Sequence, residues 1–565
     1  MNRSTSIFSA GNKWTKIAAV FCLFLLLNSF FSCGTSASLS HTPELADYPL
    51  EIPRVTKIND STFVYGQNFL QRNRQQTWEL FLTGNALQLG YNNGALAQTL
   101  IQKQENIFFD KVAELVPSKN RQWLLRKLLA YYNRNMHQHI RNDFQAEIYG
   151  LSQYSSDQYN YIAPKFLRSM YLHGAHDIGH AMQDLMLVGC SSLAVWDEKS
   201  ENGDLLIGRN FDFYAGDDFA KEKITAFVKP ETGIPYMYVT WPGMTGVVSG
   251  MNREGLTVTM NAGKSGIPWS AKTPVSLLAK EILQFAKNIG EAVEIAKKRE
   301  VFVSESLMVG SAEDRKAVLI EISPGNFGVY DVPNSKSLIC TNHFQSGAFQ
   351  KDKKNSKWRA ESHSGYRYER ISELLQEHSK LNPQEMAEIL RNREGSGNEK
   401  LGFGNEKALN QLLAHHAVIF SPEKRLVWVS TSPYQLGEMV CYDLEKIFSE
   451  TTSVKSLASA EFNIPRDSFA DSREFQNYER YRQLDRTIDD AIANKKQISE
   501  EFLEQYRNLN PDLWIVHYKS GKYDYEQKRY QQAKKHFETT LLKVISSKPE
   551  EQKVRIKLRK TNRKL

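Results

Sequence analysis

The sequence predicts an α+β fold in which layers of short antiparallel strands carry helices inserted between them. The 565 residues are 41% hydrophobic and 24% charged, as in folded proteins and unlike disordered or polytopic membrane proteins. Short strand-like segments bounded by Gly, Asn and Asp cluster between residues 190 and 431. Helical segments interrupt these strands only at Pro274–Arg299, Tyr366–Glu377 and Pro383–Arg391, so a parallel α/β sheet is not expected.

Residues 1–33 have the layout of an export signal. Three basic residues precede the apolar run 17–27, which is short for a membrane span, and small residues follow it. Cys33 resembles the lipidated cysteine at the end of a bacterial lipoprotein signal. We therefore expect an exported protein of the bacterial cell envelope, lipid-anchored at Cys33 and facing the periplasm. Ordinary cleavage nearby, or an uncleaved anchor, remain alternatives.

Residues 34–60 are rich in Gly, Ser, Thr and Pro and predict a tether. Residues 61–189 predict a helical N-terminal segment, because apolar residues recur at helical spacing in Gln67–Gly90, Ala95–Leu115 and Asn120–Asp143.

A strand-rich domain is expected from residue 190 to about 450. Its predicted strands are Cys190–Trp196, Leu205–Phe213, Ile224–Lys229, Tyr236–Val248, Gly255–Met260, Leu307–Gly310, Ala317–Ile322, Ser337–Thr341, Ala417–Phe420 and Leu426–Thr431.

Residues 455–565 predict a helical extension that contains one tetratricopeptide-like helical hairpin and ends in a basic tail. One such repeat cannot bury its own apolar face. The extension is therefore expected to pack on the core, with docking of a protein partner as the alternative. The basic tail favours a solvated end, with contact to anionic lipid as the second interpretation.

The charge distribution argues against nucleic-acid binding. The net charge is +8, but residues 1–32 contribute +3 and residues 548–565 contribute +6. The remaining chain carries −1, so the main domains have no basic footprint for nucleic acid.

Cys190, Cys340 and Cys441 are the cysteines outside the leader. Three widely spaced thiols do not form a disulfide framework, although a Cys340–Cys441 bond is one use for two of them. Exported proteins tend to avoid idle thiols, so at least one is expected to have a function.

Cys190 follows Gly189 at the start of a predicted strand, where its thiol can attack the preceding carbonyl. If the Gly189–Cys190 amide shifts to a thioester and hydrolyses, Cys190 gains a free α-amino group. That amine, with a reference pKa of about 7.7–8.0, would be a base for the thiol on the same residue. A buried structural cysteine is the alternative interpretation of this short motif.

Further polar residues occur where predicted strands or helices begin and end. Arg209 and Asp212 are spaced for an ion pair that would favour the thiolate and hold the amine. Asn261 and Asn342 end two strands, and their amides could bind an oxyanion. Arg367 lies near the start of a helix. Taken singly, each residue also fits a structural role.

Gly-Cys-Ser-Ser at 189–192, Gly-Arg-Asn-x-Asp at 208–212, Asn-Ala-Gly at 261–263, Thr-Asn-His at 341–343 and Arg-Tyr-x-Arg at 367–370 together resemble one family. That family is the cysteine N-terminal-nucleophile (Ntn) hydrolases, in particular the penicillin acyltransferase-like (C45-type) proteins, with choloylglycine hydrolases and acid-ceramidase-type amidases as relatives.

The resemblance covers residues 185–445 and implies a four-layer αββα fold, cleavage between Gly189 and Cys190, and attack on non-peptide amides. It implies that Cys190 is the nucleophile and that Arg209 and Asp212 orient it. Asn342, and less surely Asn261, would bind the oxyanion, and Arg367 matches the later arginine.

The expected substrate is therefore a small N-acyl amide, cleaved through a Cys190 thioester without a cofactor. An acyltransferase using the same acyl-enzyme is one alternative, and a non-catalytic envelope binding protein whose helical tail docks partners is another. The long segment before Cys190, which would become a separate subunit, favours the penicillin acyltransferase and ceramidase side of the family. The helical extension belongs to neither pattern.

His173, His176 and His180 lie on one helix face with Asp177 alongside. No carboxylate or thiol motif completes a metal site, so no metal is expected, and packing near the cleavage junction is the preferred interpretation.

Overall fold

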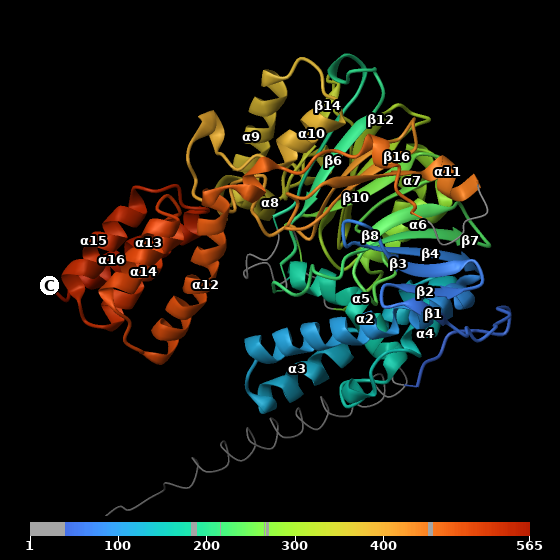
Figure 1. The fold of residues 1–565 in the computed structure, drawn as a ribbon, viewed down its shortest axis with the longest axis horizontal. Helices are drawn as coiled ribbons and strands as arrows, with labels where there is room; N and C mark the ends of the chain where they lie inside the picture. The colour runs from blue at the N-terminus through green and yellow to red at the C-terminus, as the bar shows by residue number, and fades with distance from the viewer. Residues whose placement is uncertain (1–39, 182–188, 215, 265, 267–269, 450–455) are drawn as a thin grey trace, which may run out of the picture.

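The computed structural model describes residues 40–181, 189–214, 216–264, 266, 270–449 and 456–565. The predicted leader, including Cys33, lies outside these residues. Within them, no helix combines the length and apolar character needed to cross a lipid bilayer. The described chain forms two β-sheets, helices on their outer faces, and a helical extension beside them (Figure 1).

The larger sheet has eleven strands, and neighbours are antiparallel except for the parallel pair β4–β7. In spatial order they are β1 (Thr56–Asn59), β2 (Thr62–Tyr65), β3 (Asn68–Arg72), β4 (Trp78–Gly84), β7 (Ile224–Pro230), β8 (Tyr236–Thr240), β9 (Ser249–Asn252), β10 (Leu256–Ala262), β11 (Glu305–Ser311), β12 (Lys316–Ser323) and β13 (Asn326–Tyr330).

The smaller sheet has six antiparallel strands. In spatial order they are β14 (Ser337–Cys340), β5 (Ser191–Val195), β6 (Leu206–Phe211), β15 (His416–Ser421), β16 (Leu426–Ser430) and β17 (Met439–Asp443).

Period-two alternation in the strands places the two sheets face to face. In β4, Leu80 packs with the outer helices while Phe81 joins the core between the sheets, where it meets Ile207 and Val418 of the smaller sheet. The outer face of the larger sheet is covered by α2 (Ala86–Leu115), α4 (Asn142–Ser152), α5 (Lys165–Ala181), α6 (Val275–Phe285) and α7 (Ile289–Lys297). The smaller sheet is covered by α9 (His363–Glu377) and α10 (Pro383–Leu390). The layers therefore follow the order αββα, and the α+β prediction is confirmed.

The other α-helices among the described residues of 40–449, here named the main body, are α3 (Lys119–Tyr132), α8 (Lys353–Glu361) and α11 (Leu444–Ser449).

The prediction of a helix at Gln67–Gly90 is wrong for the residues up to Gly84, because β3 and β4 occupy this stretch. Residues 78–82 of β4 are buried on both faces of the sheet, so their apolar run lacks strand alternation and does not distinguish strand from helix. The helix begins after Asn85, whose side chain accepts from the Gln88 amide as an N-cap. The segment before Cys190 thus supplies four strands of the larger sheet, and β1 begins inside the expected tether.

The three cysteines outside the leader are free and buried, so the Cys340–Cys441 disulfide is wrong. Cys340 lies in β14 and Cys441 in β17, the opposite edges of the smaller sheet. Five strand spacings of about 4.8 Å separate these edges by roughly 24 Å, far beyond the reach of a disulfide.

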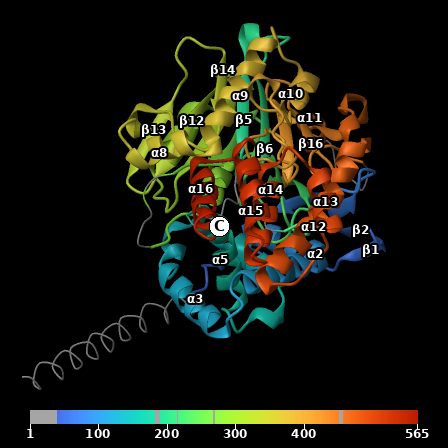
Figure 2. The ribbon, with the colours of Figure 1, turned by 90° about the vertical axis from the view of Figure 1, so that its left-hand side faces the viewer.

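The C-terminal extension is a helical unit that packs against loops before β15 and between β16 and β17, and it faces the viewer in Figure 2. Its helices are α12 (Arg473–Asn494), α13 (Glu500–Leu509), α14 (Trp514–Glu526), α15 (Tyr530–Leu541) and α16 (Lys548–Asn562). Their apolar core includes Leu412 and Leu436 from the main body. Gly521 permits close crossing of α14 and α15, since a Cβ there would lie 2.9 Å from the Phe537 ring.

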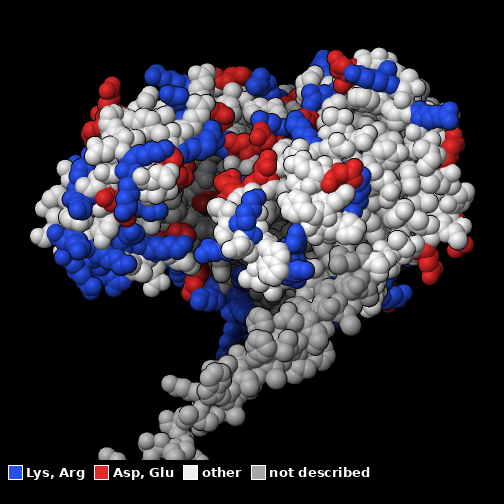
Figure 3. Space-filling view, turned by 90° about the horizontal axis from the view of Figure 1, so that it is seen from below, with Lys and Arg blue, Asp and Glu red and all other residues white. Residues whose placement is uncertain are grey.

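Lysines and arginines gather over the end of the molecule that the C-terminal helices form (Figure 3). Helix α16 carries much of the basic tail, and its Lys553 and Arg555 pair with Glu550 and Glu551.

Candidate active site

Cys190 lies directly before β5 and is fully buried. The antiparallel pairing of β5 with β6 sets Ser191 opposite Asn210, and the Gly189 amide donates to the Asp212 carbonyl oxygen at 3.2 Å. The strand pairing therefore brings the Gly189–Cys190 peptide beside the Gly-Arg-Asn-x-Asp motif, as the sequence suggested.

Arg209 reaches the thiol from β6, and its Nη2 lies 3.7 Å from Cys190 Sγ. The same guanidinium donates to Ser249 Oγ and to the carbonyl oxygens of Val248 and Met260, which fixes its position. Burial raises the pKa of the Cys190 thiol to about 11, although Arg209 opposes this rise. In the uncleaved chain the thiol is thus protonated at neutral pH, and a base must accept its proton before attack.

Asp212 is fully buried, and neither of its carboxylate oxygens has a hydrogen-bond partner among the described residues. Burial raises the pKa of this carboxyl to about 7, with Arg367 and Arg209 acting in the opposite direction. Its charge also raises the pKa of Cys190, so the carboxylate lies within electrostatic range of the thiol. A buried carboxylate without a hydrogen-bond partner destabilises the folded chain, and both oxygens of Asp212 can still accept a hydrogen bond.

Arg367 projects from α9 and ties the nucleophile to Asn342. Its Nη1 donates to the Cys190 carbonyl oxygen at 2.5 Å and to Ser191 Oγ at 2.7 Å, while Nη2 donates to Asn342 Oδ1 at 2.7 Å. The structure therefore gathers Cys190, Arg209, Asp212, Arg367 and Asn342 around one peptide.

The two asparagines bridge the sheets. Asn261 Nδ2 donates to the Cys340 carbonyl oxygen at 3.1 Å, and its Oδ1 accepts from Ser192 Oγ at 2.9 Å. Asn342 Nδ2 donates to the Ala262 carbonyl oxygen at 3.0 Å. Each amide nitrogen has a second hydrogen, so an oxyanion role stays a prediction for both, and Asn342 is the one joined to Cys190 through Arg367.

Two contacts were missed by sequence analysis. Gln411 Nε2 donates to the Gly189 carbonyl oxygen at 3.0 Å, and His363 Nδ1 lies 3.0 Å from Arg367 Nη2. Gln411 belongs to a loop without strand or helix pattern, so no local motif indicated it. His363 stands at the start of the predicted helix, next to the motif, and helix spacing of four residues to Arg367 was the available signal.

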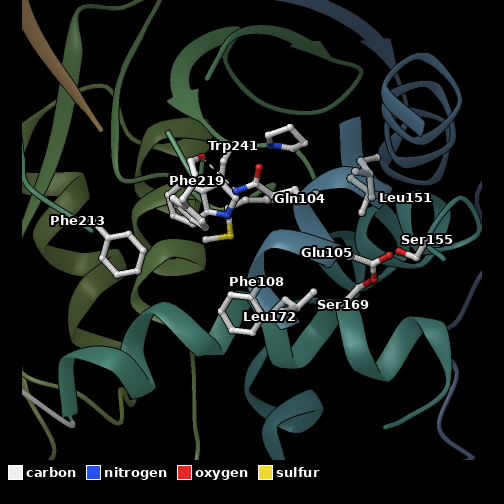
Figure 4. Close-up of a pocket in the computed structure, with 14 residues that line it drawn as sticks. Gln104, Glu105, Phe108, Leu151, Ser155, Ser169, Leu172, Phe213, Phe219 and Trp241 are labelled. Atoms are coloured by element: carbon white, nitrogen blue, oxygen red, sulfur yellow. Dashed lines mark hydrogen bonds between the residues drawn. The ribbon is translucent and has the colours of Figure 1, made fainter. Parts of the chain in front are cut away.

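An aromatic wall extends from the nucleophile to a small cavity. The Arg209 guanidinium carbon lies 4.3 Å from the Phe211 ring centroid, and Phe211 stacks with Trp241. Trp241 and Phe213 line one side of the cavity, while Glu105 and Ser169 lie on another (Figure 4). The cavity measures about 60 Å³, enough for a few water molecules.

His173 has a structural role in the described helix. Its Nδ1 bonds the Ser169 carbonyl oxygen at 2.8 Å, and its Nε2 accepts from the Thr245 amide at 3.0 Å, so both ring nitrogens are engaged. Asp177 accepts from the Val275 amide at the start of α6. The side chains of His176 and His180 lie outside the described residues. Across the described part of the chain, no three His, Cys, Asp or Glu side chains converge as metal ligands.

Residues 198–432 match the family model of acyl-coenzyme A:6-aminopenicillanic acid acyl-transferase. This part of the chain is therefore similar to the penicillin acyltransferase-like proteins. The match includes Arg209, Asp212, Asn342 and Arg367, and Cys190 lies shortly before it. The αββα layers agree with the fold that the sequence resemblance implies.

A protein of Archaeoglobus fulgidus, described as uncharacterized, is 23% identical over 270 residues, 44% of this chain and 44% of that protein. The chain thus spans less than half the length of the curated relative that it matches.

Among solved structures, a Caenorhabditis elegans N-acylethanolamine-hydrolyzing acid amidase ortholog is 19% identical, with a TM-score of 0.31, covering 41% of this chain and 93% of that one. Two variants of the conjugated bile acid hydrolase from Clostridium perfringens are similar. One is 15% identical with a TM-score of 0.33, covering 48% of this chain and 96% of its own. The other is 13% identical with a TM-score of 0.31, covering 49% and 98%.

Proposed function

We propose that the chain cleaves itself between Gly189 and Cys190 and then acts as an amidohydrolase on small N-acyl amides. The observation that carries this proposal is the buried Asp212 carboxylate, which has no hydrogen-bond partner among the described residues. It lies close enough to Cys190 for its charge to raise the pKa of the thiol. Cleavage would create an α-ammonium group on Cys190, one residue after the Gly189 amide that donates to the Asp212 backbone carbonyl oxygen, and this new group would be a donor for the Asp212 carboxylate.

Self-cleavage begins when the Cys190 thiol gives its proton to Asp212, whose pKa of about 7 suits a base at neutral pH. Sγ bonds to the Gly189 carbonyl carbon, the Gly189–Cys190 C–N bond breaks, and the amine nitrogen takes the proton. Water then attacks the thioester carbon, the C–S bond breaks, and sulfur regains a proton. The products are a Gly189 carboxylate and a free Cys190 amine.

Substrate hydrolysis repeats this chemistry on an external amide. The Cys190 amine is the base, Arg209 favours thiolate from 3.7 Å, and Asn342 binds the oxyanion while Arg367 holds its amide. The aromatic wall of Phe213 and Trp241 favours an apolar acyl group. Water releases the acid from the Cys190 thioester.

Acyl transfer is a second candidate, favoured by the acyl-transferase family model. An amine would replace water in the last step, while the acyl-enzyme stays the same. Adding hydroxylamine to a turnover assay separates the two: accumulation of acyl hydroxamate at the expense of free acid supports an acceptor-competent site.

The decisive experiment is intact mass and N-terminal sequencing of the purified protein beside Cys190→Ala. We expect two fragments from the wild type, the second beginning at Cys190, and one whole chain from the variant. Screening of N-acyl amides follows on the cleaved form. A wild-type chain that stays whole would contradict the proposal and favour a non-catalytic binding protein whose helical tail docks partners.

We also propose export and lipid anchoring at Cys33, on the support of the leader's basic, apolar and small-residue order. Metabolic labelling with palmitate should mark the wild type and not Cys33→Ala. Equal labelling of both, or of neither, would contradict the anchor.

A further inference from the structure

The carbonyl oxygen of Gly189 has a side-chain donor in place before any cleavage. Gln411 Nε2 donates to it at 3.0 Å, and the Gln411 side chain is 2% exposed. Among the described residues, Gln411 is the side chain that donates to the Gly189 carbonyl oxygen. The donor lies on the bond that the proposed self-cleavage breaks.

Gly189 is what lets Gln411 come so close. A Cβ at position 189 would lie 2.4 Å from Gln411 Nε2 and 2.9 Å from its Oε1. Such distances are not tolerated, so any side chain at 189 would displace the amide. The glycine of the Gly-Cys motif therefore has a second use besides backbone freedom.

The loop that carries Gln411 is held on both sides. Asn410 Oδ1 accepts from the Leu412 amide at 3.0 Å, and the Asn410 amide donates to the Asn392 carbonyl oxygen at 2.8 Å. Leu412 adopts a left-handed φ of +52°, which is strained for a residue with a branched side chain. From α12, the Tyr478 hydroxyl donates to the Leu412 carbonyl oxygen at 3.3 Å. These hydrogen bonds hold Leu412 in a strained conformation and so fix the position of the neighbouring Gln411.

We propose that Gln411 is a catalytic residue of self-cleavage. When Cys190 Sγ bonds to the Gly189 carbon, the carbonyl π electrons move to oxygen, and the Gln411 N–H stabilises the oxyanion. The same donor serves again when water attacks the thioester. This inference rests on the proposed self-cleavage and adds the group that lowers its barrier.

Among the described residues Asn342 makes no hydrogen bond to the Gly189 carbonyl oxygen, which Gln411 already contacts. Asn342 Nδ2 donates to the Ala262 carbonyl oxygen, and its Oδ1 accepts from Arg367. We therefore assign Gln411 to the oxyanion of self-cleavage and Asn342 to that of the external substrate. The two reactions use different donors around one thiol.

The test is a pulse–chase measurement of fragment appearance after cell-free synthesis of the full chain. Gln411→Met keeps the length of the side chain and removes the donor, and cleavage should slow about 100-fold. Gln411→Glu, which places a negative charge at the oxyanion, should slow it at least as much at pH 8. Gln435→Met is the matched control, because Gln435 is 1% exposed and donates to the Leu390 carbonyl oxygen, away from the scissile bond.

Folding is compared in uncleavable chains, Cys190→Ala against Cys190→Ala/Gln411→Met, by thermal unfolding. Equal melting temperatures with slow cleavage of Gln411→Met support the inference. Cleavage of Gln411→Met at the wild-type rate, or slowing matched by Gln435→Met or by an equivalent loss of melting temperature, would overturn it. A wild-type chain that never cleaves would overturn the proposed function itself, so the two failures are distinguishable.

Discussion

Replacing Asp212 by Asn should make the uncleaved protein more stable at neutral pH while preventing self-cleavage. Burial raises the pKa of this carboxyl from its ordinary 3.8 to about 7. The folded state therefore binds a proton more tightly than the unfolded state between these values, and stability falls as pH rises through that window. At 1.36 kcal/mol per pKa unit, the ionised carboxylate costs the folded protein about 4 kcal/mol above pH 7.

The assay is urea unfolding of two uncleavable chains, Cys190→Ala and Cys190→Ala/Asp212→Asn, from pH 4 to pH 8. The stability difference between them should grow by about 3 kcal/mol from pH 5 to pH 8 and level off above the folded pKa. At pH 4 the carboxyl is protonated in the folded state and roughly two-fifths protonated in the unfolded state, so ionisation contributes only about 0.6 kcal/mol to the difference there and the rest reports the change of side chain. A difference that stays constant across this range would refute the argument that Asp212 is buried without a partner in the precursor.

Three further predictions test the surroundings of the site. Gly189→Ala should slow self-cleavage at least tenfold, because its Cβ would displace the Gln411 amide, and a gel time course compares it with the wild type. Lys280→Met leaves the buried Glu147 carboxylate without its ion-pair partner and should cost about 3–5 kcal/mol in urea unfolding, whereas a loss below 1 kcal/mol would contradict that pairing. Tyr478→Phe removes one hydrogen bond between α12 and the loop that carries Gln411. The free energy of unfolding should fall by about 1 kcal/mol and cleavage should slow. If neither quantity changes, the hydrogen bond has no part in stability or cleavage.

The strands of the central core were predictable because clear turn residues bound short strand-like segments there. Leu206–Phe211 and Leu256–Ala262 lie within a residue or two of their expected bounds. Strands β3 and β4 were not, because their apolar residues also fit helical spacing and the chain continues directly into helix α2. The expected strand Tyr236–Val248 is in fact β8, ending at Thr240, followed by a loop that leads to β9.

The candidate site was predictable where chemistry-bearing residues lie in or beside sheet strands, or near the start of a helix. Arg209 is fixed by the register of β6 against β5, so its approach to Cys190 follows from sheet pairing. Asn261 lies in the other sheet and reaches the site across the layer between the sheets, where it accepts from Ser192. Gln411 could not be found this way. It is 222 residues from Gly189, and its approach depends on an Asn410 turn and on a helix of the extension.

The extension contacts two loops near the nucleophile. These contacts join residues far apart in the sequence, so no local motif of the extension could indicate its role. Tyr478 bonds the loop carrying Gln411, and on the same helix Arg482 and Arg486 pair with Asp217, five residues after Asp212. Helix α12 thus contacts the loop that carries Gln411 on one side and the segment after Asp212 on the other. Because the proposed self-cleavage needs the Gly189 carbonyl oxygen and the Asp212 carboxylate aligned with one thiol, we expect α12 to help hold both in place.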